Sequence, residues 1–139
     1  MNVYSQQEDI DWILAESETI AVVGLSSRTT RAGYYVPAYL QDAGYRTIPV
    51  NPYIAEALGE KAYPDLEAVP LPVDLVLIFQ RSEKVPPFVD AAIEIGAKAV
   101  WLQLGIVNEA AAEKARAAGL RVVQNACMMV EHRYWQPAA

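Results

Sequence analysis

The 139-residue sequence predicts a Rossmann-like α/β fold, doubly wound around a mainly parallel five-stranded sheet with helices on both faces. Short runs that are apolar almost throughout alternate with helix-like segments, and glycines end most of these segments just before the next run begins. Hydrophobic residues make up 53% of the chain and charged residues 20%, which excludes an intrinsically disordered protein. We therefore interpret residues 1–139 as a single domain.

The opening segment, residues 1–18, predicts a helix that packs on the sheet. Ser5 and Glu8 have the spacing of an N-terminal capping box. Ile10 and Ile13 lie on one side of such a helix, so that side is expected to face the core.

Five largely apolar runs have the length of strands. This composition is typical of parallel strands that are covered on both faces. The runs are Ile20–Val23, Thr47–Val50, Leu75–Phe79, Ala99–Leu102 and Leu120–Val123. Parallel neighbours require right-handed crossovers, which predicts helices between most of them.

Three segments between these runs repeat apolar or alanine residues at helical spacing. They are Tyr35–Ala43, Val85–Ile93 and Ala111–Ala118. Gly44, Gly96 and Gly119 stand just after these segments, where the left-handed conformation favours glycine.

Smaller signals refine these elements. Ser82 and Asn108 stand where helix N-caps are expected, and Pro37 is expected in the first turn of its helix. Leu66–Val69 predicts only a short helix between the second and third strands, and residues 125–139 are expected to form a C-terminal tail.

Charge and composition restrict the function. The net charge of −6 argues against nucleic-acid binding, because such binding depends on Lys and Arg neutralising phosphates. No apolar run is long enough to span a membrane, and residues 1–19 lack the apolar core of a signal peptide. With a single cysteine and therefore no internal disulfide, the chain is expected to be cytoplasmic.

No residue pattern predicts catalysis or metal binding. Cys127 and His132 alone cannot complete a structural zinc site of Cys and His ligands. Their separation of five residues does not favour a nucleophile–base pair on a helix. Paired carboxylates and catalytic triads do not stand out, so we predict no catalytic residue and no metal site, and whether the protein is an enzyme stays open.

Ligands of open α/β sheets bind outside the carboxyl ends of the strands, near the switch in strand order. This rule marks four candidate segments: Gly24–Gly33, Asn51–Tyr53, Gln80–Glu83 and Gln103–Val107. The first contains four hydroxyl and two guanidinium side chains ahead of a predicted helix, which favours a phosphate. A solvated loop of ordinary turn residues is the alternative.

The loop matches neither common nucleotide motif. Ser26 replaces the second glycine of G-x-G-x-x-G, and no Lys-Ser or Lys-Thr pair of a Walker loop follows Thr29. NAD sites place an acidic residue at the end of the second strand, whereas this chain has Asn51 and Pro52 there. NAD is therefore disfavoured, NADP stays open through an arginine, and Asn51-Pro52 is equally consistent with a simple turn.

Several strings in one order resemble a known family. These are Ile20–Ser26, Ile48–Pro52, Gly59–Pro64, Trp101–Ile106 and Cys127–His132. Together they cover roughly the whole chain and resemble the small single-domain CoA-binding proteins. That family is similar to the CoA-binding domain of succinyl-CoA synthetase alpha chains.

The resemblance implies coenzyme A bound across the strand ends. It assigns Gly24, Ser26 and Arg31 to the phosphates, and Asn51 and Pro52 to the nucleotide. It also implies that Phe79, Gln80 and Arg81 line the wall after the third strand and that Gly105 lies near the pantetheine arm. The chemistry of their side chains adds Ser27 and Arg28 to the phosphate site.

Two departures from the family pattern accompany these matches. Members commonly have Phe-Arg after the third strand, where this chain has Phe79-Gln80-Arg81. They also commonly have Asp-Arg-Cys near the end, where this chain has Asn125-Ala126-Cys127.

The main hypothesis is a protein that binds CoA or an acyl-CoA without catalysis. The alternatives are an NADP-linked oxidoreductase, a partner-dependent acyl-CoA ligase subunit, and an interaction protein whose loop binds an anionic group of a partner. No nucleic-acid or membrane partner is expected, and a homo-oligomer stays open.

Overall fold

Five strands form the central sheet of the computed structural model, which describes residues 6–137. They are β1 (Thr19–Val23), β2 (Arg46–Val50), β5 (Leu75–Ile78), β6 (Ala99–Leu102) and β7 (Arg121–Val123). Their order is β2-β1-β5-β6-β7, and every pairing is parallel. The predicted fold class is confirmed; the third strand ends at Ile78, one residue before the predicted end at Phe79.

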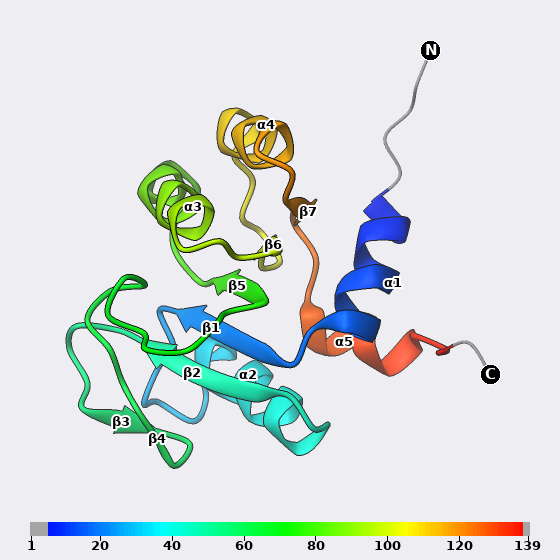
Figure 1. Cartoon of the computed structure of the whole chain (residues 1–139). Helices are drawn as coiled ribbons and strands as arrows, with labels where there is room; N and C mark the ends of the chain where they lie inside the picture. The colour runs from blue at the N-terminus through cyan, green and yellow to red at the C-terminus, as the bar shows by residue number, and fades with distance from the viewer. Residues whose placement is uncertain (1–5, 138–139) are drawn as a thin grey trace.

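Helices cover both faces of this sheet (Figure 1). They are α1 (Gln6–Glu16), α2 (Ala32–Asp42), α3 (Val85–Glu94), α4 (Glu109–Ala117) and α5 (Met128–Tyr134), with a 3-10 turn η1 (Ser82–Lys84) before α3. Apolar side chains of α3 and α4 share one core with the sheet, and those of α1, α2 and α5 share the other. No helix within residues 6–137 is long and apolar enough to cross a lipid bilayer.

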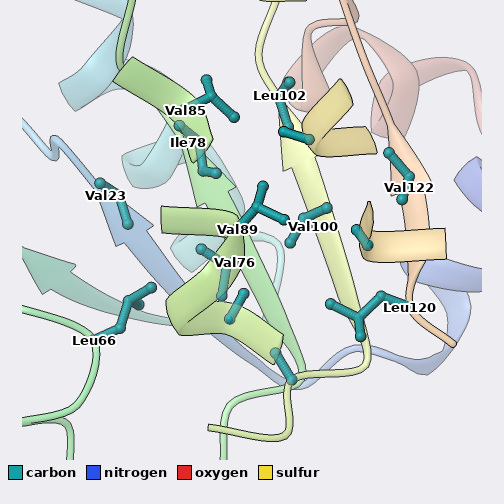
Figure 2. Packing of buried hydrophobic residues seen from close by; sticks show 14 of the residues in the cluster. Val23, Leu66, Val76, Ile78, Val85, Val89, Val100, Leu102, Leu120 and Val122 are labelled. Atoms are coloured by element: carbon teal, nitrogen blue, oxygen red, sulfur yellow. The ribbon is translucent and has the colours of Figure 1, made fainter. Parts of the chain in front are cut away.

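Alternate residues of each strand enter opposite cores. In β5, Val76 and Ile78 pack with Val85 and Val89 of α3 (Figure 2), whereas Leu75 and Leu77 face the other core. Because both faces are buried, nearly every position of these strands needs an apolar side chain. This requirement explains why the strands read as continuous apolar runs.

The strand order reverses between β1 and β5. The chain leaves β1 for β2 on one side and later returns to form β5 on the other side of β1. Crossover segments therefore diverge at the carboxyl ends of β1 and β5, which opens a crevice there. The loops that follow these strands meet at this edge.

Two features of the segment between β2 and β5 differ from the prediction. An unpredicted antiparallel hairpin pairs β3 (Glu56–Ala57) with β4 (Glu60–Lys61). The predicted helix at Leu66–Val69 is wrong: a turn forms there, with Ala68 N–H donating to Asp65 Oδ1. A proline follows this turn directly at position 70 and disfavours helical backbone in the residue before it.

The helix caps were predicted in part. Asn108 is confirmed as the N-cap of α4, since its Oδ1 accepts the N–H of Ala111. Ser82 is not an N-cap; it lies within η1, and its Oγ accepts the N–H of Val107. Pro37 was also misplaced, because α2 begins at Ala32 and the proline lies in its interior.

At the termini, Ser5 lies outside the described residues, so the predicted capping box is not described. Helix α1 packs its buried side, including Ile10 and Ile13, in the core that it shares with α2. The segment expected to be a C-terminal tail contains α5.

Candidate functional site

A cleft of about 890 Å³ lies at the carboxyl ends of the strands. Residues that follow β1, β2, β5 and β6 line it, together with Phe88 of α3. Ten of the eleven predicted site residues line the cleft, and only Gly105 does not. The ten lining residues are Gly24, Ser26, Ser27, Arg28, Arg31, Asn51, Pro52, Phe79, Gln80 and Arg81.

Gly24 begins the loop after β1 in a conformation that favours glycine. Its φ is +87°, and its N–H donates to the carbonyl of Val50 at 3.0 Å. A Cβ at this position would lie 2.6 Å from the carbonyl oxygen of Phe79. The absence of a side chain therefore allows the loops after β1 and β5 to approach each other closely at the base of the cleft.

Ser26 ties the loop to the first turn of α2. Its N–H donates to the carbonyl of Gly33 at 2.9 Å, and its Oγ accepts the N–H of Arg28 at 3.0 Å. The Gly33 carbonyl is available because Pro37, four residues later, has no N–H to donate to it. The Ser26 hydroxyl keeps its own hydrogen for a ligand oxygen.

Gly33 is a second close-approach position, and the sequence prediction did not select it as a site residue. A Cβ there would lie 3.1 Å from the carbonyl oxygen of Gly24. The small residue lets α2 start directly against the loop. Its place at the end of the Gly24–Gly33 segment was the available signal, because a glycine at a helix start often permits close packing.

The cleft carries positive charge on an acidic protein. Arg28, Arg31 and Arg81 line it with exposed side chains, and no Asp or Glu is among the lining residues. Within residues 6–137, none of these three guanidinium groups forms a salt bridge. The N-terminus of α2 adds first-turn N–H groups and the positive end of its dipole, so this end of the cleft favours an anion.

Asn51 braces two of the cleft loops. Its Nδ2 donates to the carbonyl of Leu25 at 3.0 Å, and its Oδ1 accepts the N–H of Tyr53 at 2.8 Å. The side chain thus joins the ends of β1 and β2. One amide hydrogen is left over for a ligand, so the predicted nucleotide contact stays a prediction.

After β6 the chain forms a tight turn from Gln103 to Ile106. The N–H of Ile106 donates to the carbonyl of Gln103 at 2.9 Å, and Gly105 has a φ of +87°. Positive φ at the third residue is the requirement of a type II turn. Leu104 and Ile106 line the cleft, whereas Gly105 does not, and its N–H donates to Asn125 Oδ1 at 2.8 Å.

The hydrogen bond between Gly105 and Asn125 gives a role to the departure from the family pattern at Asn125-Ala126-Cys127. Asn125 holds the turn, and the carbonyl of Ala126 accepts the indole N–H of Trp101. At the other departure, where this chain has Phe79-Gln80-Arg81 in place of Phe-Arg, both Gln80 and Arg81 line the cleft.

Other lining residues belonged to candidate elements but were not selected. Tyr53 and Leu104 lie in loops that the sequence marked, and both are exposed. Phe88 lies within the predicted helical segment Val85–Ile93 and was not selected as a site residue. Because α3 starts at the carboxyl edge of the sheet, its first turns contribute to the cleft as well as to the core.

The cleft lining contains no His, Cys, Lys, Asp or Glu. His132 lies elsewhere, with Nδ1 2.8 Å from the hydroxyl of Tyr39 and its ring in edge contacts with Tyr39 and Tyr45. Cys127 occupies the N-cap position of α5. Within the described part of the chain, no group of three or more His, Cys, Asp or Glu side chains is arranged to hold a metal ion.

Known proteins that are similar to this chain share its fold. The chain is 44% identical over 124 residues to the uncharacterized protein YneT of Bacillus subtilis (strain 168). The alignment covers 89% of this chain and 92% of that protein. A hypothetical protein from Pyrococcus horikoshii OT3 has 40% identity and a TM-score of 0.88, over 94% of this chain and 91% of that chain.

A larger protein shares the fold over part of its length. The apo form of the dinucleotide forming acetyl-coenzyme A synthetase 1 of Ca. Korarchaeum cryptofilum is 28% identical, with a TM-score of 0.70. The match covers 80% of this chain and 26% of the synthetase. Residues 18–133 match the family described as the CoA binding domain. The chain is therefore a member of the CoA-binding domain family.

Proposed function

We propose that this protein binds coenzyme A or an acyl-CoA in the cleft at the carboxyl ends of β2, β1, β5 and β6, and that it catalyses no reaction. The observation that carries the proposal is the anion-favouring loop Gly24–Gly33. It combines two close-approach glycines, a helix N-terminus and three nearby guanidinium groups.

The distribution of groups along the cleft supports one direction for the ligand. The diphosphate contacts the N–H groups of the loop and the Ser26 hydroxyl, with Arg28 or Arg31 alongside. The nucleotide lies toward Asn51 and the exposed ring of Tyr53. The pantetheine arm then runs toward the ends of β5 and β6.

The composition of the cleft supports binding without catalysis. General acid–base and nucleophilic chemistry need a titratable or activated group within hydrogen-bond reach of the substrate. The lining offers arginines, amides and hydroxyls but no His, Cys, Lys or carboxylate. These residue types hold a phosphorylated ligand and do not supply an evident base.

Isothermal titration with CoA, NADH and NADPH tests the proposal. We expect CoA to bind more tightly than either nicotinamide cofactor. Tighter binding of NADPH would favour the oxidoreductase alternative and overturn the assignment. Native mass spectrometry of the purified protein provides an independent reading, since a co-purified ligand would appear as the added mass of CoA or of an acyl-CoA.

A second candidate function is favoured by the acetyl-coenzyme A synthetase neighbour. This chain corresponds to only 26% of that protein, so ligation here would need a partner chain. Incubation of the protein with CoA, a carboxylic acid and ATP, with acyl-CoA formation as the readout, separates the two candidates. We expect no acyl-CoA from the isolated protein.

A further inference from the structure

We infer that the end of the cleft beside β6 binds the aliphatic chain of an acyl-CoA, so that the preferred ligand is an acylated rather than a short or free form of the coenzyme. This inference rests on the proposed function. The apolar side chains Phe88, Leu104 and Ile106 line the cleft, and Leu104 and Ile106 come from the turn after β6.

The arginines of the cleft lining come from two of its four loops. Arg28 and Arg31 follow β1 and Arg81 follows β5, whereas Gln103–Asn108, which follows β6, contains no charged residue. Phe88 and Ile106 are half-buried and also pack against the core beneath the cleft. The apolar wall is therefore continuous with the protein interior.

Leu104 is the most unusual residue of this end. Its side chain is 65% exposed although it is large and aliphatic. Val107, in the same connection, is 41% exposed. Exposed apolar side chains that cluster beside a cleft are typical of a surface that contacts an apolar ligand.

The turn that carries Leu104 is held in place on two sides. The Gly105 N–H donates to Asn125 Oδ1, and the Asn125 N–H donates back to the carbonyl of Ile106. Val107 N–H donates to Ser82 Oγ at 3.0 Å. Leu104 is thus presented by a fixed turn, which reduces the entropy cost of binding an acyl chain.

The position of the turn suits the reactive end of the ligand. Neighbouring strands lie about 4.8 Å apart, so the ends of β2 and β6 are separated by roughly 14 Å across the three intervals. A ligand with its nucleotide at β2 and its diphosphate at β1 therefore directs its thioester end past β5 to the Leu104 turn.

The test is a calorimetric series of acetyl-, butyryl-, hexanoyl- and octanoyl-CoA. Burial of one methylene strengthens binding by about fourfold. Because the cleft is open at Leu104, we expect a total gain of about tenfold or more from acetyl- to hexanoyl-CoA. Equal affinities along the series would overturn the inference and leave CoA binding intact, whereas failure to bind acetyl-CoA and CoA would overturn the proposed function itself.

Two matched variants connect the chain-length effect to the turn. Leu104→Ser is expected to reduce the hexanoyl-to-acetyl affinity ratio at least threefold, by removing apolar contact area without adding charge. Tyr134→Ser changes another exposed apolar residue, 80% exposed on α5 and not part of the cleft lining, and should leave the ratio unchanged. An unchanged ratio in Leu104→Ser, with the thermal unfolding midpoint preserved, would refute the role of the turn.

Discussion

At the residue scale, two glycines determine how near a ligand comes to the backbone of the cleft. Gly24 and Gly33 each leave a space that a Cβ would fill, and the nearest atoms are backbone oxygens. Backbone atoms cannot rotate away as a flexible side chain does. Ser26 then fixes the loop between them through its N–H and its Oγ. The amide groups that favour an anion are thereby held in position before any ligand arrives.

The variant Gly24→Ala tests this close approach. It combines a positive φ with a Cβ that would lie 2.6 Å from Phe79 O, so we expect a loss of about 2–4 kcal/mol in the free energy of unfolding. Gly119→Ala is the matched control, with a φ of +91° and no heavy atom within 4 Å of the added Cβ. It should cost only about 1–2 kcal/mol. Equal losses in urea denaturation would contradict the proposed contact.

A second variant at this scale concerns the phosphate that Arg31 holds. If its guanidinium binds the ribose 3′-phosphate, Arg31→Ala should weaken CoA at least fivefold more than dephospho-CoA in calorimetry. Arg133→Ala removes an exposed arginine of α5 outside the cleft and should affect neither ligand. Equal losses for the two ligands would assign Arg31 to the diphosphate instead.

At the scale of elements, side chains complete the hydrogen bonding of the sheet where backbone pairing stops. Gln6 of α1 exchanges two bonds with the backbone of Gln124, at 2.7 Å and 3.0 Å, and so covers the edge of the sheet beyond β7. Asp74 acts at the opposite end of the strands from the cleft. Its Oδ2 accepts the N–H groups of Glu18 and Thr19, which fixes the start of β1 beside β5.

These contacts make Asp74 a pH-dependent element of stability. Burial raises the pKa of Asp74, but the N–H groups of Thr19 and Glu18 and the Lys98 ammonium outweigh burial, so the pKa lies below the usual 3.8. A carboxyl with a lowered pKa in the folded state adds stability above about pH 4. This contribution disappears as the pH falls through the folded pKa.

Asp74→Asn is therefore expected to lower the free energy of unfolding by about 1–2 kcal/mol at pH 7. The difference from the unaltered protein should shrink as the pH falls below about 4. Asp90→Asn, in an exposed ion pair with Lys114, is the control and should cost less than about 1 kcal/mol. A deficit for Asp74→Asn that stays constant down to pH 2 would contradict this explanation.

At the scale of the whole molecule, burial explains which parts could be predicted. Strands such as β5 are buried on both faces, so their sequences are largely apolar runs. Parallel pairing then follows from the alternation with helices, and the strand ends mark the edge where the cleft lies. The candidate cleft could be located from sequence for this reason, before any side-chain contact was known.

The missed features depend on contacts that have no local pattern. The β3–β4 hairpin has two-residue strands, and its turn places Leu58 at a φ of 54°, whereas such turns usually contain Asn or Asp there. Pro37 was predicted in the first turn because a proline there loses no hydrogen bond. It lies in the interior of α2 instead, and the distant Ser26 N–H bonds to the Gly33 carbonyl that Pro37 leaves without its helical partner. Ser82 was assigned to its own helix, although its hydroxyl bonds to Val107 across the edge of the sheet.

The most direct test of the central claim is a crystal structure of this protein with bound coenzyme A. We expect electron density for the diphosphate against the backbone N–H groups of Gly24–Gly33, with the adenine toward Tyr53 and the thiol toward the turn at Leu104. Density for the coenzyme at any other surface, with only water at the loop after β1, would contradict the account.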